Sequence, residues 1–131
     1  MKLEVWQRGM DLFEMAWQLW RQAQDFKLKS QFVDAAQSVP ANISEGYRRR
    51  TLSKYIQFLY TAKGSLAETL TRACGLRQVR LILDAEFQEF DKVHYEVENK
   101  LLALIQSVEA KRGTGQWLDS LPHQSTNPSI H

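Results

Sequence analysis

Few residues in this sequence have the types and the spacing that metal binding requires. His94 lies in a helical pattern with Asp91 three residues before it, whereas His123 and His131 lie in a polar C-terminal region. Metal centres in helical bundles take Glu-x-x-His pairs from two helices together with further carboxylates, and this sequence contains half of one such pair. We therefore expect no metal ion and no cofactor, and we expect His94 to be buried and hydrogen-bonded.

Nucleophilic catalysis has equally little support. Cys74 is the single cysteine, and it lies in an apolar helical pattern without the features of a reactive thiol. The sequence has no glycine-rich phosphate loop and no Ser-His-Asp set that its spacing supports. These observations predict that the protein is not an enzyme. One cysteine excludes an intrachain disulfide, and the N-terminus lacks an apolar signal region, so we expect a cytoplasmic location.

Basic residues are the strongest candidates for binding a partner. Residues 48–80 contain eight basic residues and one acid, whereas residues 81–112 contain seven acids and four basic residues. The net charge of +2 is too small to indicate a nucleic-acid binder by itself. A basic and an acidic helix would partly neutralise each other across a bundle, so the charge asymmetry has a structural explanation.

One group of basic residues lies at an expected helix junction. Its members are Arg48, Arg49, Arg50 and Lys54. Consecutive arginines can contact phosphates without reading bases, which predicts weak, sequence-independent and salt-sensitive nucleic-acid binding. The alternative is that the arginines form a solvated loop or pair with acids of another subunit, such as Glu86 and Glu89.

Hydrophobic periodicity predicts four helices. We expect the first helix to end near residues 25–27. It has a main apolar stripe, which further apolar residues widen on one side. The stripe consists of Trp6, Met10, Phe13, Trp17 and Trp20, and the widening residues are Leu12, Ala16 and Leu19. The second helix is expected from Ser30, as the N-cap, to Gly46, as a C′ glycine, with a kink near Gln37 caused by Pro40.

The third helix should begin at Thr51 or Ser53 and end before Val79. Its apolar arc consists of Leu52, Tyr55, Ile56, Leu59, Ala62, Leu66, Leu70 and Ala73. Gly64 lies in the middle of this helix. A glycine there costs about 1 kcal/mol relative to alanine, which predicts that a neighbouring helix approaches closely at Gly64.

The fourth helix should begin at Asp84, acting as the N-cap. Its apolar seam consists of Phe87, Phe90, His94, Val97, Leu101, Leu104 and Val108. Lys63 of the third helix falls on the apolar arc of that helix. We expect its ammonium group either to snorkel outward or to meet a carboxylate, Glu14 or Glu45, inside the bundle. Simple exposure at the edge of the helix is the remaining alternative.

Together these elements predict an all-α protein with the architecture of an antiparallel up-and-down four-helix bundle. We place the bundle domain at residues 1–112 and a loosely packed tail at residues 113–131, where Trp117 and Leu118 are the residues expected to dock. No apolar run is long enough to predict a membrane span, and we expect no membrane partner.

Two runs of residues resemble a known family. Residues 31–47 contain the pattern Ser-x-Pro-x-Asn-Ile-x-Glu-Gly, and residues 58–68 contain Ala-Lys-Gly-Ser. These runs, with Val5-Trp6 placed before the first helix, resemble the "four helix bundle protein" family. That family takes its other name from reading frames in intervening sequences of bacterial 23S ribosomal RNA genes. The resemblance covers roughly residues 3–110.

The resemblance implies a bundle that often assembles as a homopentamer. It also implies a relationship to the accessory variability determinant proteins of diversity-generating retroelements, which are basic pentamers that bind nucleic acid and a reverse transcriptase. The family commonly has two arginines where this sequence has Val33 and Asp34. This departure weakens the transfer of nucleic-acid binding to the second helix.

Two hypotheses of function follow. The first is a non-catalytic oligomeric adaptor that holds nucleic acid, or a nucleic-acid-processing protein such as a reverse transcriptase, through its basic residues. The second is a protein–protein assembly module without a nucleic-acid role. Trp6, Trp20 and Phe58 motivate the second hypothesis. Phe58 lies off the main apolar arc of the third helix, and aromatic residues of that kind are enriched at interfaces.

Overall fold

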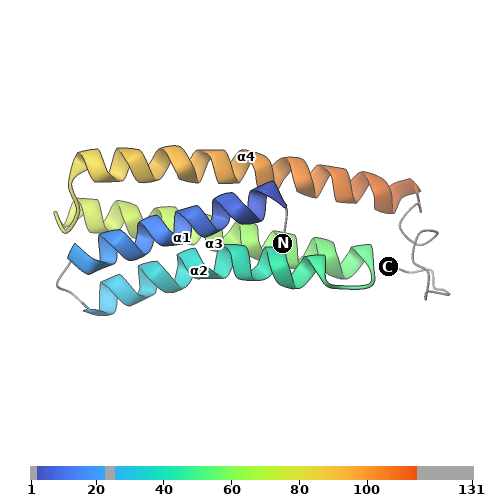
Figure 1. Cartoon of the computed structure of the whole chain (residues 1–131), viewed down its shortest axis with the longest axis horizontal. Coiled ribbons are helices and arrows are strands. Elements are labelled where there is room, and N and C mark those ends of the chain that lie inside the picture. Colours follow the sequence, from blue (N-terminus) through green and yellow to red (C-terminus); the bar gives the residue numbers. More distant parts are fainter. Residues whose placement is uncertain (1–2, 23–25, 115–131) are drawn as a thin grey trace.

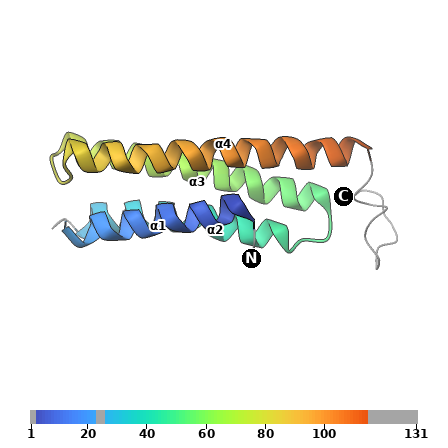
Figure 2. The same ribbon diagram turned by 45° about the horizontal axis from the view of Figure 1, so that its top comes forward.

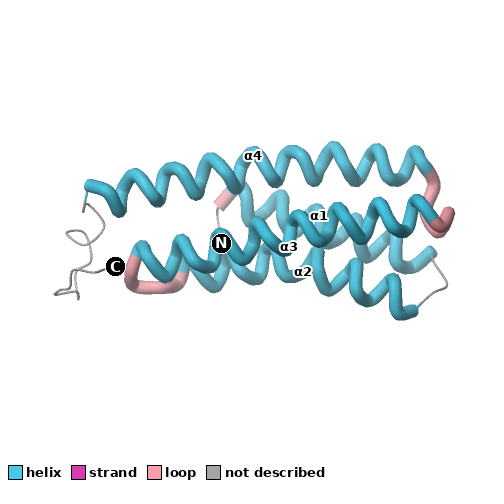
Figure 3. Tube along the Cα trace, turned by 180° about the vertical axis from the view of Figure 1, so that it is seen from behind, coloured by secondary structure: helices cyan, strands magenta, loops and turns pink. Residues whose placement is uncertain are grey.

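The computed structural model describes residues 3–22 and 26–114, and these residues form four helices without a strand. The helices are α1 (Glu4–Gln22), α2 (Phe26–Tyr47), α3 (Leu52–Gln78) and α4 (Asp84–Thr114). Each helix runs antiparallel to the next (Figure 1), and the turn between α2 and α3 lies at the opposite end of the bundle from the turn between α3 and α4 (Figure 3). The predicted all-α, antiparallel up-and-down bundle is confirmed.

The core is formed by one face of every helix. α1 packs on α2 and α4, and α3 packs on the same two neighbours, so α1 and α3 occupy diagonal corners. Phe32 of α2 and Phe90 of α4 are fully buried, and their rings meet across the centre at 5.2 Å between centroids, in a tilted geometry. Such aromatic contacts stabilise a core beyond the area they bury. None of the helices within the described residues has the length and hydropathy of a membrane span.

The inner face of α1 is not the stripe that the sequence predicts as the main one. Its buried apolar residues are Val5, Leu12, Ala16 and Leu19. Met10 and Trp17, from the predicted stripe, are 39% and 42% exposed, while the side chain of Trp20 lies outside the described residues. Both stripes follow steps of three and four residues, but the inner one contains the small residues Gly9 and Ala16, which are both buried. At Gly9 a Cβ atom would lie 3.5 Å from Cβ of Pro40 on α2.

α2 is longer than the sequence predicts. It begins at Phe26, so Ser30 lies inside the helix, where its hydroxyl donates to the carbonyl of Lys27 at 3.1 Å and does not cap the N-terminus. The helix also includes Gly46, which is therefore not a C′ residue. It continues without a break through Pro40, and the kink expected near that residue stays a prediction.

The close helix crossing lies at Gly46 and not at Gly64. A Cβ atom built on Gly46 would lie 2.8 Å from Cβ of Phe58 and 3.2 Å from the carbonyl oxygen of Tyr55, so only a glycine lets α2 and α3 meet here. The same atom built on Gly64 would have no neighbour within 4 Å. Gly64 is on the outer face of α3, and the predicted crossing at this residue is wrong.

The ends of α3 are capped, and they lie where the sequence predicts them. The Thr51 hydroxyl accepts a hydrogen bond from the Lys54 amide at 3.2 Å, as an N-cap residue does. After the helix, Arg80 has a left-handed backbone with φ of 64°. Its amide donates to the carbonyl of Arg77, and the next amide, of Leu81, donates to the carbonyl of Leu76. These two bonds form a Schellman motif with arginine at the position that glycine usually occupies.

α4 begins one residue after its N-cap, which is Leu83. The Leu83 amide donates to the Glu86 carboxylate at 2.8 Å, as in one half of a capping box, so Asp84 is the first helical residue and not the cap. Gly113 and Thr114 belong to α4, although the sequence assigns them to the tail. Residues 115–131, including Trp117 and Leu118, lie outside the described residues.

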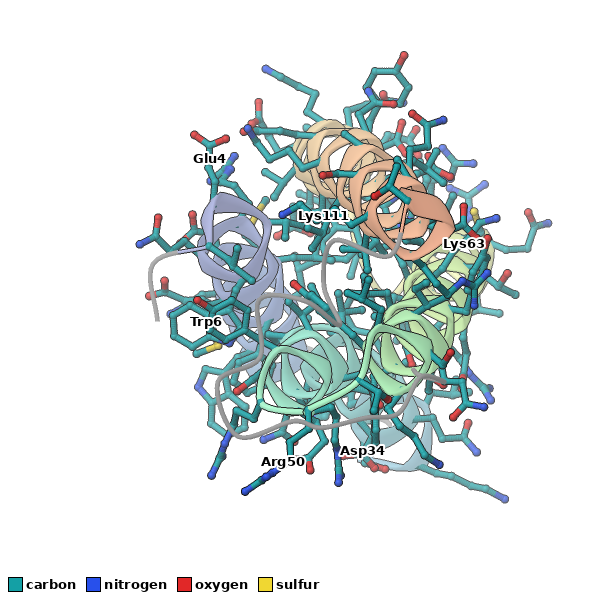
Figure 4. The ribbon with its side chains drawn as sticks, turned by 90° about the vertical axis from the view of Figure 1, so that its right-hand side faces the viewer. Glu4, Trp6, Asp34, Arg50, Lys63 and Lys111 are labelled. Carbon is teal, nitrogen blue, oxygen red and sulfur yellow. The ribbon has the colours of Figure 1, made fainter. Side chains whose placement is uncertain are left out.

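The apolar arcs of α3 and α4 are confirmed with two shifts and one correction. Leu70 and Leu104 are half-buried, and the neighbouring residues Thr69 and Ile105 are buried in their place. Lys63 is exposed, with its ammonium 5.8 Å from the centroid of the Tyr60 ring, and Figure 4 shows it pointing away from the bundle. The predicted internal contact with Glu14 or Glu45 is therefore wrong, and Lys63 is exposed at the edge of the helix, as the remaining alternative predicts.

Candidate functional site

The four predicted basic residues meet at one end of the bundle, in the turn between α2 and α3. Together with Thr51 they line a hollow of about 340 Å³; they are Arg48, Arg49, Arg50 and Lys54. The turn places them there because the last turn of α2 continues as far as Arg49, whose amide donates to the carbonyl of Gly46, and Thr51 then starts α3. All four basic side chains are exposed, and Figure 4 shows Arg50 extending away from the bundle.

Arg49 is held in place by two neighbouring side chains. Its guanidinium forms an ion pair with the Glu45 carboxylate one turn earlier and lies 4.7 Å from the centroid of the Phe58 ring. The side chain is 42% exposed, so a ligand can still approach it. Phe58 is half-buried beneath this guanidinium, which accounts for an aromatic residue off the core arc of α3.

The acids considered as partners for these arginines lie at the other end of the chain's own bundle. Glu86 accepts the Leu83 amide at the start of α4, and Glu89 lies 3.9 Å from the ammonium of Lys92. Contact between these acids and the arginines thus requires a second copy of the chain. Among the described residues no ion pair joins the basic α3 to the acidic α4; a hydrogen bond from Tyr60 to Glu109 at 2.8 Å links them instead.

A second surface lies between α1 and α2, where the exposed stripe of α1 faces outward. Trp6, Met10 and Phe13 line a hollow of about 250 Å³ against α2. A neighbouring hollow of about 430 Å³ is lined by Met10, Phe13, Glu14 and Trp17. We call these two adjoining hollows the α1–α2 furrow; its α2 wall consists of Gln37, Pro40, Ala41 and Ser44.

The sequence carried a signal for this furrow that the interpretation of α1 missed. A helix with one buried face needs one apolar stripe, whereas α1 has two that run side by side. Four of the five residues predicted as the main core stripe line the furrow: Trp6, Met10, Phe13 and Trp17. Figure 4 shows Trp6 at the outer edge of α1, on the side toward α2.

The contact between α1 and α4 is ionic at its edge. Arg8 of α1 pairs with Glu96 of α4 at 2.7 Å and with Asp11 at 2.6 Å. The hydrogen bond to Glu96 is the main cause that raises the pKa of Arg8, and the same bond lowers the pKa of Glu96. Nε of Arg8 is buried without an acceptor among the described residues. A further pair joins Lys100 to Glu4 at 2.7 Å.

His94 is buried, with Nε2 2.8 Å from the carbonyl oxygen of Leu66, which confirms the predicted structural role. Within the described part of the chain no group of three or more histidine, cysteine or acidic residues is placed to hold a metal ion.

Comparison with known proteins identifies the family and a solved structure with the same fold. Residues 1–103 match the family described as 23S rRNA-intervening sequence protein. A solved structure from Bacteroides thetaiotaomicron, described as a protein with unknown function from the S23 ribosomal protein family, has the same fold. It aligns with a TM-score of 0.74 and 18% identity over 77% of this chain and 97% of that one. The curated proteins contain no match to this sequence. Val5 and Trp6, which the sequence comparison placed before the first helix, lie within α1. The match over residues 1–103 shows that the chain belongs to the 23S rRNA-intervening sequence protein family.

Proposed function

We propose that this protein is a non-catalytic oligomeric adaptor whose copies associate through the α1–α2 furrow. The observation that supports the proposal is the exposure of Met10 and Trp17 beside Trp6 and Phe13 on one face. Aromatic residues and methionine are enriched in the buried centres of interfaces, and charged residues are depleted there. Among the residues whose side chains the structure describes, Glu14 is the one charged residue that lines the furrow.

The energetics favour a protein partner for this face. Each square ångström of apolar surface that is removed from water contributes about 25 cal/mol, and single large aromatic side chains dominate binding at many interfaces. Methionine adapts its shape to a partner because its side chain is unbranched and flexible. The number of copies is five by the family resemblance, and this number stays a prediction.

Light scattering of the purified chain tests the proposal. We expect the wild type to form an oligomer at micromolar concentration, and we expect Met10→Ser and Trp17→Ser to lower the measured mass toward that of one chain. Tyr95→Ser is the matched control, because Tyr95 is 64% exposed on α4 and lies outside the furrow. A monomeric wild type, or furrow variants that keep the wild-type mass, would contradict the proposal.

The basic hollow favours a second role for the same adaptor, which is contact with the phosphates of a nucleic acid. Arg48, Arg50 and Lys54 are exposed around one hollow, and Arg49 is held in place by Glu45. Basic side chains at such a surface contact the backbone without reading bases. A nucleic-acid-processing protein would then bind to the nucleic-acid strand that the assembled adaptor holds.

Titration with a single-stranded oligonucleotide at two salt concentrations tests this second role. We expect the triple variant Arg48→Ala/Arg49→Ala/Arg50→Ala to bind more weakly. The slope of log affinity against log salt should become shallower by about 0.7 for each phosphate that the variant no longer neutralises. A chain with Lys27→Ala, Lys63→Ala and Lys92→Ala is the control, since these three residues are exposed and the chain loses the same charge elsewhere. Equal affinity of the triple variant and the wild type would remove nucleic acid from the proposed function.

A further inference from the structure

We infer that residues 115–131 of one copy bind in the α1–α2 furrow of another copy, with Trp117, Leu118 and Leu121 as the anchors. The inference rests on the proposed function, because it identifies the partner segment for the same furrow. It makes the C-terminal segment a strap between subunits.

The segment lies beyond the part of the chain that the family shares. The family match ends at residue 103. The alignment with the Bacteroides structure includes 97% of that chain but only 77% of this one. A chain without this extension therefore forms the same bundle. Residues 115–131 lie outside the family match, and they contain three large apolar residues within five positions.

The anchors have the spacing that a furrow between two helices accepts. Trp117, Leu118 and Leu121 are at positions i, i+1 and i+4, which lie on one side of a helical turn. Amphipathic segments with this spacing bind in apolar grooves on other proteins. The two adjoining hollows of about 250 and 430 Å³ provide two places for bulky side chains, side by side along α1.

The use of Trp117 as an anchor requires that the segment comes from another copy. Lys100 pairs with Glu4, so this part of α4 is level with the start of α1, and α4 continues to Thr114, about 21 Å further along the axis. Figures 1 and 2 show this end of α4 extending well beyond the start of α1. Trp117 is three residues after Thr114 and can extend about 10 Å. It cannot reach the furrow of its own chain.

A peptide-binding experiment tests the inference directly. The probe is a fluorescently labelled peptide of residues 115–131, and the receiving protein is the full chain with Trp117→Ala, Leu118→Ala and Leu121→Ala, which removes the competing anchors. We expect saturable binding that Met10→Ser/Trp17→Ser in the receiving chain weakens at least tenfold. Tyr95→Ser in the receiving chain should leave the affinity unchanged. A peptide with the three anchors replaced by alanine should not bind.

A mixing experiment tests the exchange between copies. The furrow variant Met10→Ser/Trp17→Ser keeps its anchors. The anchor variant, which is the chain with Trp117→Ala, Leu118→Ala and Leu121→Ala, keeps its furrow. Each variant should associate weakly alone, and the mixture of the two should form a complex. Absence of peptide binding, or binding that the furrow variant does not weaken, would overturn the inference. If furrow variants lower the mass of the oligomer but the anchor variant does not, the proposed function holds and the inference fails. If neither variant changes the mass, both fail.

Discussion

α1 and α3 stand at diagonal corners of the same bundle, yet they are held in different ways. α3 has one apolar face, a cap at each end and a close crossing with α2 at Gly46. α1 has two apolar faces, and at its edge toward α4 it is held by the ion pairs of Arg8 and Glu4. α3 uses its apolar surface within the bundle, whereas α1 leaves Met10 and Trp17 exposed to solvent.

The difference shows how a helix can serve the core and a binding surface at once. The stripe of small and medium residues on α1 lies inside, where the helices must come close, and the stripe of large aromatic residues lies outside. Large residues on the inside would force the helices apart. The apolar surface that remains outside is what distinguishes α1 from α3 and points to a partner.

The largest difference in the free energy of unfolding is expected between substitutions on the inner and the outer face of α1. Leu12 is fully buried, so Leu12→Ala should lower the free energy of unfolding by about 2–5 kcal/mol. Met10→Ala, two residues away on the exposed face, should change it by less than about 1 kcal/mol. Urea denaturation at low protein concentration measures both. Equal losses in the two variants would mean that α1 has no distinct inner face.

A smaller loss is expected where α2 crosses α3. Gly46→Ala places a Cβ 2.8 Å from Cβ of Phe58, and the backbone must shift to accept it. We expect a loss of about 1–3 kcal/mol in the free energy of unfolding. Gly64→Ala is the control and should gain up to about 1 kcal/mol, because the site is open and alanine favours the helix. A loss of stability in Gly64→Ala together with a gain in Gly46→Ala would mean that the close crossing lies at Gly64.

The end of α3 offers a stabilising change. Arg80 holds a left-handed backbone that glycine adopts without steric cost. Arg80→Gly should therefore raise the free energy of unfolding by about 0.5–1 kcal/mol. Gln78→Gly, in the last turn of the helix, should lower it by a similar amount. A loss of stability in Arg80→Gly would show that the arginine side chain contributes more than the backbone costs.

The smallest effect concerns the ionic edge between α1 and α4. Because Arg8 holds the pKa of Glu96 below its ordinary value in the folded protein, the stabilisation is present above the ordinary glutamate pKa and is lost as the pH falls through the lower, folded pKa. Glu96→Gln should lower the melting temperature at neutral pH and leave it nearly unchanged in strong acid. Glu98→Gln on the same helix is the control. A difference between wild type and Glu96→Gln that does not shrink in acid would exclude this linkage.

Much of the candidate site could be predicted from local sequence. Arg48, Arg49, Arg50 and Lys54 are close in the chain, so the turn after α2 brings them together whatever the rest of the bundle does. The furrow could not be predicted in this way. It joins residues of α1 to Pro40 and its neighbours on α2, which meet only when the two helices pack.

The sequence by itself determined the four helices, the start of the third helix to within two residues and the burial of His94, because periodicity acts over one or two turns. The tertiary structure alone decided which of the two stripes of α1 lies inside and which glycine lies at a crossing. A stripe or a glycine has the same local pattern in either position, and its role depends on the size of the side chains that a neighbouring helix brings to it. That is why Gly46 is the close contact and Gly64 is open, and why Trp17 faces outward while Leu12 is buried.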